Sequence, residues 1–254
     1  MTNVQITTGA DSHGMTVFDQ TSERQDLAKR AEVKYAMTGV DIDKLRSHLA
    51  GNCRQLIHNN RVSIVRSIYF DDETLSACRA NLNGISSRRK LRMRWYDSVT
   101  PKQDVYFEIK WRENRITGKH RLHVRSLEPL DQLSYSQIND RLWHAMPEEY
   151  RCQMIIAPDP VMIVQYDREH FSSDDGSLRV TLDYNLMFFD QMGRQSISTD
   201  FPCRMEDHAV IEGKVPVGRD ADLRRLLYPY VPRANRCSKY VHGCRLLNHI
   251  HDAE

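Results

Sequence analysis

Six segments of the chain alternate charged and apolar residues at the spacing of a β-strand. Because a strand points residues i and i+2 to the same face, each segment places two or three ionic groups on one face and mostly apolar residues on the other. One such strand is typical of a half-buried sheet whose charges lie in water. Several of them, in a chain long enough to close a barrel, predict a charged interior. The segments are residues 31–35, 90–95, 106–111, 165–168, 179–183 and 210–214.

The hydrophobic pattern as a whole predicts an α+β fold, an antiparallel β-barrel with peripheral helices and a C-terminal helix. Closing the sheet would leave no exposed edges. Asp41 and Ser238 are the expected N-caps of two helices, and Gly84 is expected to end a third. Strands are expected over residues 30–37, 62–70, 90–96, 105–111, 120–125, 161–171, 177–189 and 208–215, and helices over residues 41–59, 74–83, 130–150, 220–227 and 238–249.

Composition and charge narrow the classes of protein that fit. Residues 1–25 show no periodicity and are interpreted as a flexible lead, and residues 26–254 as one domain. The net charge is only +2, which argues against a nucleic-acid partner. The sequence contains no run of about 18 apolar residues, so no membrane span is predicted. The polar N-terminus does not resemble a secretory signal. Six cysteines without a C-x-x-C pair are typical of reduced thiols, so a cytoplasmic protein is expected.

The charges of the predicted interior point to a phosphate ligand. Arginine forks match phosphate oxygens, and lysine adds mobile point charges. Burying many like charges without counterions is strongly unfavourable, so the site must hold a polyanion or be well hydrated. Carboxylates among these bases are explained by Mg²⁺ or Mn²⁺, which bind oxygen and bridge to phosphate. The bases are Lys34, Lys90, Arg92, Arg94, Lys110, Arg168, Arg179 and Lys214, and the candidate metal ligands are Glu212, Glu108 and Glu32.

Eight motifs along the chain carry a family resemblance. They are Glu32-x-Lys34-Tyr35, Ser67-Ile-Tyr-Phe-Asp71, Lys90-Leu-Arg-Met-Arg-Trp-Tyr96, Phe107-Glu-Ile-Lys110, Tyr166-x-Arg168, Arg179-Val-Thr-Leu-Asp183, Ile211-Glu212-x-Lys214 and Ser238-Lys-Tyr-Val-His-Gly243. In this order they resemble the VTC domain, the polyphosphate polymerase domain of the vacuolar transporter chaperone family, which is one of the triphosphate tunnel metalloenzymes (the CYTH superfamily). The resemblance implies an antiparallel tunnel in which the γ-phosphate of ATP extends a polyphosphate chain with Mn²⁺ or Mg²⁺.

The resemblance also implies roles for single residues. Glu212 would hold the metal, and Tyr166 would add a hydroxyl contact to the substrate. Ser238 and Lys239, with Arg236 near them, resemble the family's phosphate-binding segment, and a helix N-terminus favours an anion there. The candidate catalytic residues, which would bind the triphosphate or the product chain, are Lys34, Arg92, Arg94, Lys110, Arg168 and Arg179; Lys90 and Lys214 join the candidate substrate-binding residues.

The chain departs from the family pattern in three respects. Arg236 stands where lysine is expected, and Gly213 stands where a β-branched residue is usual and could mark a bulge. The regulatory SPX domain and the membrane helices of the eukaryotic assemblies have no counterpart, so association with a membrane would need a separate membrane protein.

Several alternatives stay open at this point. The same fold could hydrolyse tripolyphosphate or nucleoside triphosphates, or it could bind polyphosphate without turnover. Glu212 could form only an ion pair, and Asp183 could simply pair with an arginine. Tyr166 could be a packed aromatic with a satisfied hydroxyl, and Asp71 a turn or capping residue.

Overall fold

A computed structural model of the chain describes residues 7–8, 14–20, 30–114, 116–228, 230, 234 and 237–251. The strands are β1 (Thr7–Thr8), β2 (Met15–Asp19), β3 (Arg30–Thr38), β4 (Arg54–Leu56), β5 (Ser63–Asp71), β6 (Ser87–Tyr96), β7 (Asp104–Glu113), β8 (Ile116–Ser126), β9 (Asp159–Ser172), β10 (Arg179–Asp190), β11 (Cys203–Met205) and β12 (His208–Pro216). The helices are α1 (Ile42–Asn52), α2 (Ser76–Leu82), α3 (Tyr135–Ala145), α4 (Glu148–Ile156), α5 (Asp220–Leu226), α6 (Lys239–Leu246) and a short 3₁₀ turn, η2 (Leu130–Gln132). None of the described helices is both long and apolar enough to cross a membrane.

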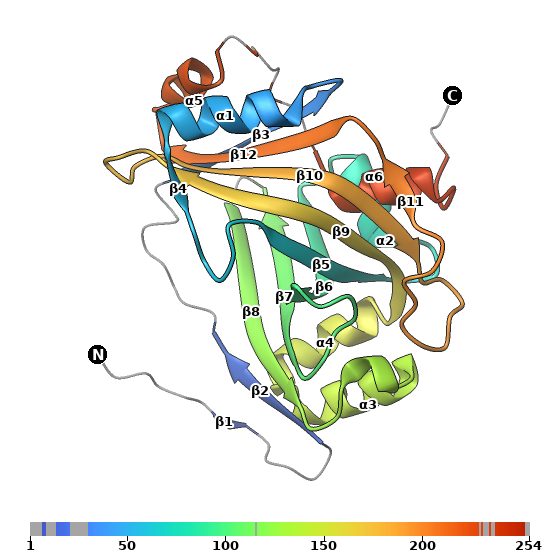
Figure 1. The fold of residues 1–254 in the computed structure, drawn as a ribbon. Helices are drawn as coiled ribbons and strands as arrows, with labels where there is room; N and C mark the ends of the chain where they lie inside the picture. The colour runs from blue at the N-terminus through green and yellow to red at the C-terminus, as the bar shows by residue number, and fades with distance from the viewer. Residues whose placement is uncertain are drawn as a thin grey trace.

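The strands form one antiparallel sheet in the order β1-β2-β8-β7-β6-β5-β9-β10-β12-β3, with β4 and β11 paired to β9 and β10. This order has two ends, so hydrogen bonds among the described residues do not close the sheet. The expected closed barrel is wrong in that respect, while the α+β class and the antiparallel pairing are confirmed. The sheet instead curls until side chains from distant strands meet: Lys110 of β7 lies 3.5 Å from Glu32 of β3. Figure 1 shows this curled sheet.

Helices cover both sides of the sheet. On the outer side, α1 and α5 pack on β3, β12 and β10 through Leu45, Leu49 and Leu223 (Figure 1). The outer side of β6, β7 and β8 is covered by α3 and α4, which lie at the bottom of the view. On the inner side, α2 and α6 pack against each other, and Tyr240 of α6 stacks on Tyr69 of β5 with ring centroids 4.9 Å apart. Three apolar clusters therefore hold the curl.

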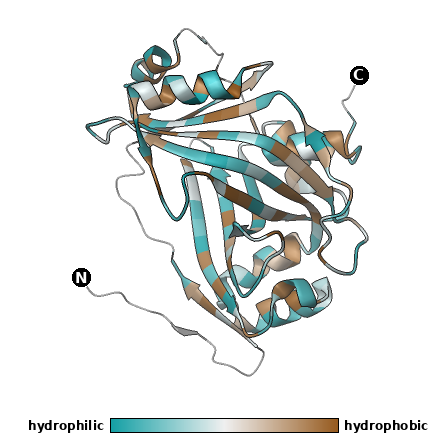
Figure 2. Cartoon of the chain, in the orientation of Figure 1, coloured by the Kyte–Doolittle hydropathy of each residue, from teal (hydrophilic) through white to brown (hydrophobic). Residues whose placement is uncertain are grey.

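Alternation along the strands separates these apolar clusters from the ionic groups. Leu91, Met93 and Trp95 of β6 are buried on the outer side, while the basic residues between them face inward. Figure 2 shows the same alternation of hydrophilic and hydrophobic positions along the long strands. The period of two therefore places the charges as the sequence predicts.

The predicted elements are largely confirmed, but β11 is not among them and three other regions differ. The first predicted helix ends at Asn52 and not at residue 59, because residues 54–56 form β4 and pair with β9. Met15–Asp19 was assigned to the flexible lead, yet it forms β2 and pairs with β8; most of the rest of that lead lies outside the described residues. The long predicted helix over 130–150 is divided, since Pro147 separates α3 from α4. Asp41 and Ser238 are confirmed as N-caps.

Gly213 marks no bulge, because the register of β12 with both neighbours runs through it without a shift. A Cβ atom at this position would lie 2.2 Å from the side chain of Leu223 in α5. The glycine is therefore explained by the close packing of α5 on the outer side of β12.

Candidate functional site

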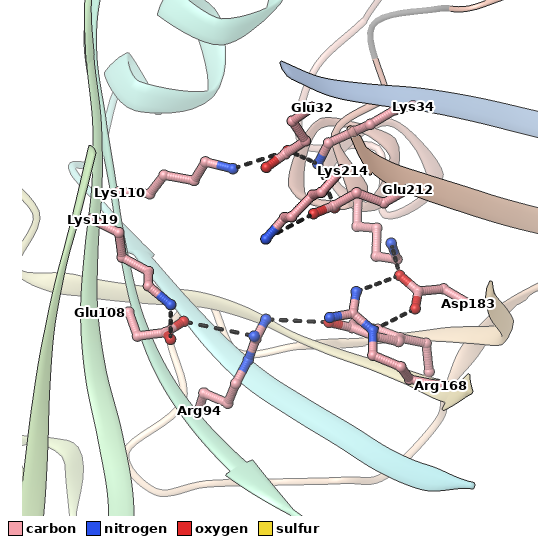
Figure 3. A network of polar contacts seen from close by, with 12 residues as sticks. Glu32, Lys34, Arg94, Glu108, Lys110, Lys119, Arg168, Asp183, Glu212 and Lys214 are labelled. Atoms are coloured by element: carbon pink, nitrogen blue, oxygen red, sulfur yellow. Dashed lines mark hydrogen bonds and ion pairs between the residues drawn. The ribbon is translucent and has the colours of Figure 1, made fainter. Parts of the chain in front are cut away.

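Strand register brings the predicted charged residues onto the inner side of the curled sheet, which we call the concave face. Glu212 of β12 lies opposite Lys34 of β3, and Glu108 of β7 lies opposite both Arg92 of β6 and Arg121 of β8. Figure 3 shows side chains from β7 and β8 directed toward those from β3, β12 and β9 across the concave side. The bases of this face are Lys34, Lys90, Arg92, Arg94, Lys110, Lys119, Arg121, Arg168, Lys214 and Lys239, and its carboxylates are Glu32, Glu108, Asp183 and Glu212.

Glu108 is the most deeply placed carboxylate of the β6–β8 wall, with a side chain only 1% exposed. Arg92 donates to it at 2.7 Å, and Lys119 donates at 3.2 Å. Arg94 and Arg121 each lie 3.7 Å from it. Burial opposes its ionisation, but Arg92 and Arg94 outweigh burial and hold the pKa of Glu108 well below its usual range. One carboxylate thus faces four cations, and positive charge is left over.

Asp183 of β10 is the buried carboxylate on the side of the concave face that lies opposite β6–β8. It is fully buried and accepts two hydrogen bonds from Arg168, at 2.6 and 2.7 Å, and one from Lys239 at 2.6 Å. Burial opposes its charge, but these two cations hold the pKa of Asp183 below its usual range. The interpretation of Asp183 as a partner of an arginine is confirmed. The pair also joins the start of α6 to β9 and β10.

A third cluster lies where β3 and β12 meet. Lys34 lies 3.2 Å from Glu32 and 3.0 Å from Glu212, and Lys214 lies 3.8 Å from Glu212. Burial disfavours the charged form of Glu212, yet Lys34 and other bases hold its pKa well below the usual range. The Glu32 carboxylate also has a lowered pKa, because Lys110 and Lys34 outweigh its burial. Both carboxylates are therefore charged at neutral pH.

Lys90 and Lys110 show that the concave face carries more positive charge than its carboxylates balance. Burial, with a contribution from Lys110 and Lys34, lowers the pKa of Lys90 to about 8. Close packing around its ammonium also lowers the pKa of Lys110, although the side chain as a whole is 45% exposed and Glu32 opposes the shift. Among the described residues, the Lys90 ammonium donates a hydrogen bond only to the Ser238 hydroxyl, at 2.7 Å, and this hydroxyl carries no charge. A bound anion would relieve both lysines.

Tyrosine hydroxyls extend this network where the concave face meets α6. Arg94 is 7% exposed and donates to Ser67 at 3.0 Å and to the Tyr166 hydroxyl at 3.2 Å. Arg92 donates to the Tyr69 hydroxyl at 3.0 Å. Burial would raise the pKa of Tyr69, but Arg92 and neighbouring cations lower it to about 7. The interpretation of Tyr166 as a buried aromatic with a satisfied hydroxyl is confirmed.

Two predicted site residues stand apart from these clusters. Arg179 begins β10 opposite Lys214 on the concave side, but it is exposed. Arg236 lies outside the described residues. Asp71 serves as a cap, since its carboxylate accepts hydrogen bonds from the backbone N–H groups of Ala77 and Cys78 in α2.

The residues present fit a divalent cation held partly by substrate. In the described part of the chain, no three His, Cys, Asp or Glu side chains group as a complete metal site. Mg²⁺ is commonly bound by one or two carboxylates together with substrate phosphates, and Glu212 with Glu32 offers such a pair. Thr181 lies opposite Glu212, and its buried hydroxyl has no hydrogen-bond partner among the described residues. Glu108 lies in another cluster, where its oxygens already accept from Arg92 and Lys119.

Sequence reasoning missed Lys119 and Arg121 as members of the site. Both lie in β8 and contact Glu108 from the strand next to it. The signal was present, because Lys119, Arg121 and His123 alternate with Leu122 and Val124 as in the other charged strands. Tyr69 is not among the predicted site residues, although its position two residues from Ser67 places it on the same face.

The chain was compared with known families, curated proteins and solved structures. The sequence profile of the VTC domain matches residues 29–248. The comparison with curated proteins gave no match. A solved structure of a proposed adenylyl cyclase from Hippeastrum with a dominant triphosphatase activity is 14% identical, with a TM-score of 0.44 and coverage of 85% of this chain and 96% of that one. A structure of GphF dehydratase 1 is 12% identical, with a TM-score of 0.15 and coverage of 80% and 96%. Both TM-scores are too low to establish a common fold.

Proposed function

The chain belongs to the VTC domain family, and from this premise we propose that it is a polyphosphate polymerase. In this proposal the concave face binds ATP and transfers its γ-phosphate to a growing polyphosphate chain, with Mn²⁺ or Mg²⁺ as the metal. Family membership supports an activity on triphosphate or polyphosphate, and the choice of polymerase is the finer part of the proposal.

The observation that carries the proposal is the unbalanced positive charge of the concave face. Each carboxylate of the concave face already contacts at least two cations, as Glu108 and Asp183 do. Lys90 has no carboxylate partner among the described residues, and burial lowers its pKa to about 8 although Tyr69 opposes this shift. Keeping these lysines charged in the absence of a ligand costs free energy. A polyanion bound to the concave face would remove that cost.

Different side chains of the concave face have different roles in phosphoryl transfer. Arg92, Arg94 and Arg168 supply fixed guanidinium forks for the phosphate oxygens, because Glu108 and Asp183 hold them in place. A terminal phosphate oxygen of the polyphosphate chain attacks the γ-phosphorus. The bond from the γ-phosphorus to the bridging oxygen breaks, and ADP leaves with that electron pair. Catalysis then rests on positioning and on the fixed positive charges that face the transferred group.

Glu212 and Glu32 are the residues that would hold the divalent cation, with Thr181 beside them. When bound, the cation would neutralise charge on the β- and γ-phosphates. Lys34 contacts both carboxylates and keeps them ionised, so the pair is ready to bind a cation at neutral pH. Glu108 is assigned to orienting Arg92 and Arg94, in place of the metal-binding role expected from sequence.

The polymerase is tested by incubating the purified protein with ATP and Mn²⁺ and resolving the products on a gel. Polyphosphate chains together with ADP are expected. Glu212→Gln should lose chain formation, while the exposed Glu73→Gln should keep it. Consumption of ATP to ADP and orthophosphate without chains would contradict the polymerase.

A hydrolase of tripolyphosphate or nucleoside triphosphates is the second candidate. It is favoured by the open edge of the sheet and by the exposure of Lys110 and Lys119, whose side chains are 45% and 43% accessible to water. Water reaching the γ-phosphate would replace the polyphosphate acceptor, and orthophosphate would be released. The same assay separates the two reactions. Binding of tripolyphosphate without any turnover would instead indicate a silent polyphosphate-binding module. The cytoplasmic location and a separate membrane partner remain predictions from sequence.

A further inference from the structure

A row of aromatic rings lies beside the charged part of the concave face. Strand register places Tyr106 of β7 opposite Arg94 of β6, His123 of β8 opposite Tyr106, and Phe18 of β2 opposite His123. The ring centroids of Tyr106 and His123 are 5.2 Å apart, and those of His123 and Phe18 are 5.9 Å apart and stacked. Tyr96 of β6 contacts Tyr106 edge-on at 6.1 Å. We call these four residues the aromatic row.

The aromatic row is not part of the apolar core. The core residues of the same strands, such as Phe107 and Leu122, alternate with it and face the outer side. Tyr96 is 37% exposed, and Tyr106 is partly exposed. The Tyr96 and Tyr106 hydroxyls form no hydrogen bond within the described part of the chain, and phosphate binding makes no use of an aromatic ring. The aromatic row is therefore suited to a ligand with a flat, uncharged face.

The spacing of the rows relates the aromatic row to the phosphate-binding residues. Along β7, Tyr106, Glu108 and Lys110 face the same side, so successive rows lie about 7 Å apart. The first row inward holds Arg92, Glu108 and Arg121, and the second holds Lys90, Lys110 and Lys119. Arg121 joins the rows directly, because its guanidinium lies 3.8 Å from the Tyr106 ring centroid and 3.7 Å from Glu108.

We propose that the aromatic row, with the Arg121 guanidinium above Tyr106, is the stacking site for the nucleobase of a nucleoside triphosphate. This inference rests on the proposed function and adds to it the place of the nucleobase, a group that inorganic tripolyphosphate lacks. Its triphosphate lies over the two basic rows, and its base stacks on an aromatic ring or on Arg121. Stacking on such surfaces tolerates every base, so ATP and GTP bind with similar affinity.

His123 is the residue that fixes the row. Its Nε2 lies 2.9 Å from Asp104, and Arg125 donates to the same carboxylate at 3.2 Å. These contacts hold the imidazole between the rings of Tyr106 and Phe18. The row is thus ordered before a ligand arrives, which lowers the entropic cost of stacking.

The test compares binding of ATP, GTP and tripolyphosphate by titration calorimetry without divalent cation, so that no turnover occurs. Tyr106→Leu removes the ring, and Tyr106→Phe keeps it. The ratio of the ATP Kd to the tripolyphosphate Kd should rise about 5- to 150-fold in Tyr106→Leu, which corresponds to the loss of about 1–3 kcal/mol per stacked base. Tyr106→Phe should keep the wild-type ratio, and Tyr96→Leu should raise it less.

Tyr228→Leu is the matched control, because Tyr228 is 69% exposed and lies at the end of α5. Equal weakening of ATP and tripolyphosphate in Tyr106→Leu would overturn the base site, as would an unchanged ratio in both leucine variants. The outcome for the proposed function is separate. If the ratio depends on Tyr106 but the wild-type protein never turns over ATP, the polymerase function is contradicted and the base site is supported. A protein that binds neither ligand would remove both.

Discussion

Replacing Lys90 with methionine should stabilise the protein while weakening its anion binding. The ordinary lysine pKa is 10.5, and burial with neighbouring cations lowers that of Lys90 to about 8. Keeping Lys90 charged at pH 7 therefore costs the folded state about 3 kcal/mol. Methionine is similar in length and carries no charge, so this cost disappears. The hydrogen bond to Ser238 is lost as well, which removes about 1 kcal/mol. The expected net gain at pH 7 is about 2 kcal/mol.

The gain should depend on pH in a defined direction. Between pH 8 and pH 10.5 the unfolded chain binds more protons at Lys90 than the folded protein does. The stability contributed by wild-type Lys90 therefore rises with pH over this window. Below pH 8 the full penalty applies, and above pH 10.5 none applies. The advantage of Lys90→Met should accordingly fall from about 2 kcal/mol at pH 7 to almost nothing near pH 10.

Urea unfolding at pH 7 and at pH 10 measures this gain. Lys44→Met is the matched control, because the Lys44 side chain is 80% exposed and should change stability by less than about 0.5 kcal/mol. A loss of stability in Lys90→Met at pH 7 would mean that the concave face does not penalise the charge of Lys90, contrary to this prediction. A gain of the same size at both pH values would refute the stated cause.

Three further changes test other parts of the structure. Asp183→Asn leaves Arg168 without its counter-charge and should lower the free energy of unfolding by about 3–5 kcal/mol in urea; a loss below about 1 kcal/mol would contradict the buried pair. Glu212→Gln should abolish metal-dependent turnover of ATP yet tighten metal-free binding of tripolyphosphate, because one negative charge leaves the face; weaker metal-free binding would count against this role. Gly213→Ala should lower stability by about 1–3 kcal/mol through overpacking against α5, whereas Gly51→Ala in α1 meets open space and should raise it by up to about 1 kcal/mol. Equal effects of the two alanines in thermal unfolding would remove the packing explanation.

The faces of the strands were predictable because a period of two depends only on the local sequence. Lys34, Arg92 and Glu212 could be assigned to the inner side from their spacing alone, and strand register confirms that placement. Partners across the curl could not be assigned in this way. The approach of Lys110 to Glu32 depends on how far the sheet bends, which is set by packing of the helices on both sides.

The missed elements have equally physical causes. Met15–Asp19 carries only a short apolar pattern, and it becomes a strand because β8 supplies its hydrogen bonds and the core buries Met15 and Val17. Leu56 fits the apolar spacing of the first predicted helix, yet residues 54–56 pair with β9 in the sheet. Whether the sheet closes depends on its end strands, and β3 at one end pairs with β12, which is far away in sequence. Tertiary contacts of this kind override the local preference of a segment for helix or strand.

The proposed function assigns the positive charge of the concave face to triphosphate binding. The most direct test is calorimetric titration of tripolyphosphate into the wild-type protein and into Lys90→Met at pH 8.5, in two buffers of different ionisation enthalpy. An anion bound beside Lys90 raises its pKa from about 8, so the wild-type protein should take up more protons on binding than the variant does. The protons of the ligand itself contribute equally to both and cancel in the comparison. Tight binding with this excess uptake is the result expected. No binding of tripolyphosphate, or equal proton uptake by the two proteins, would contradict this assignment.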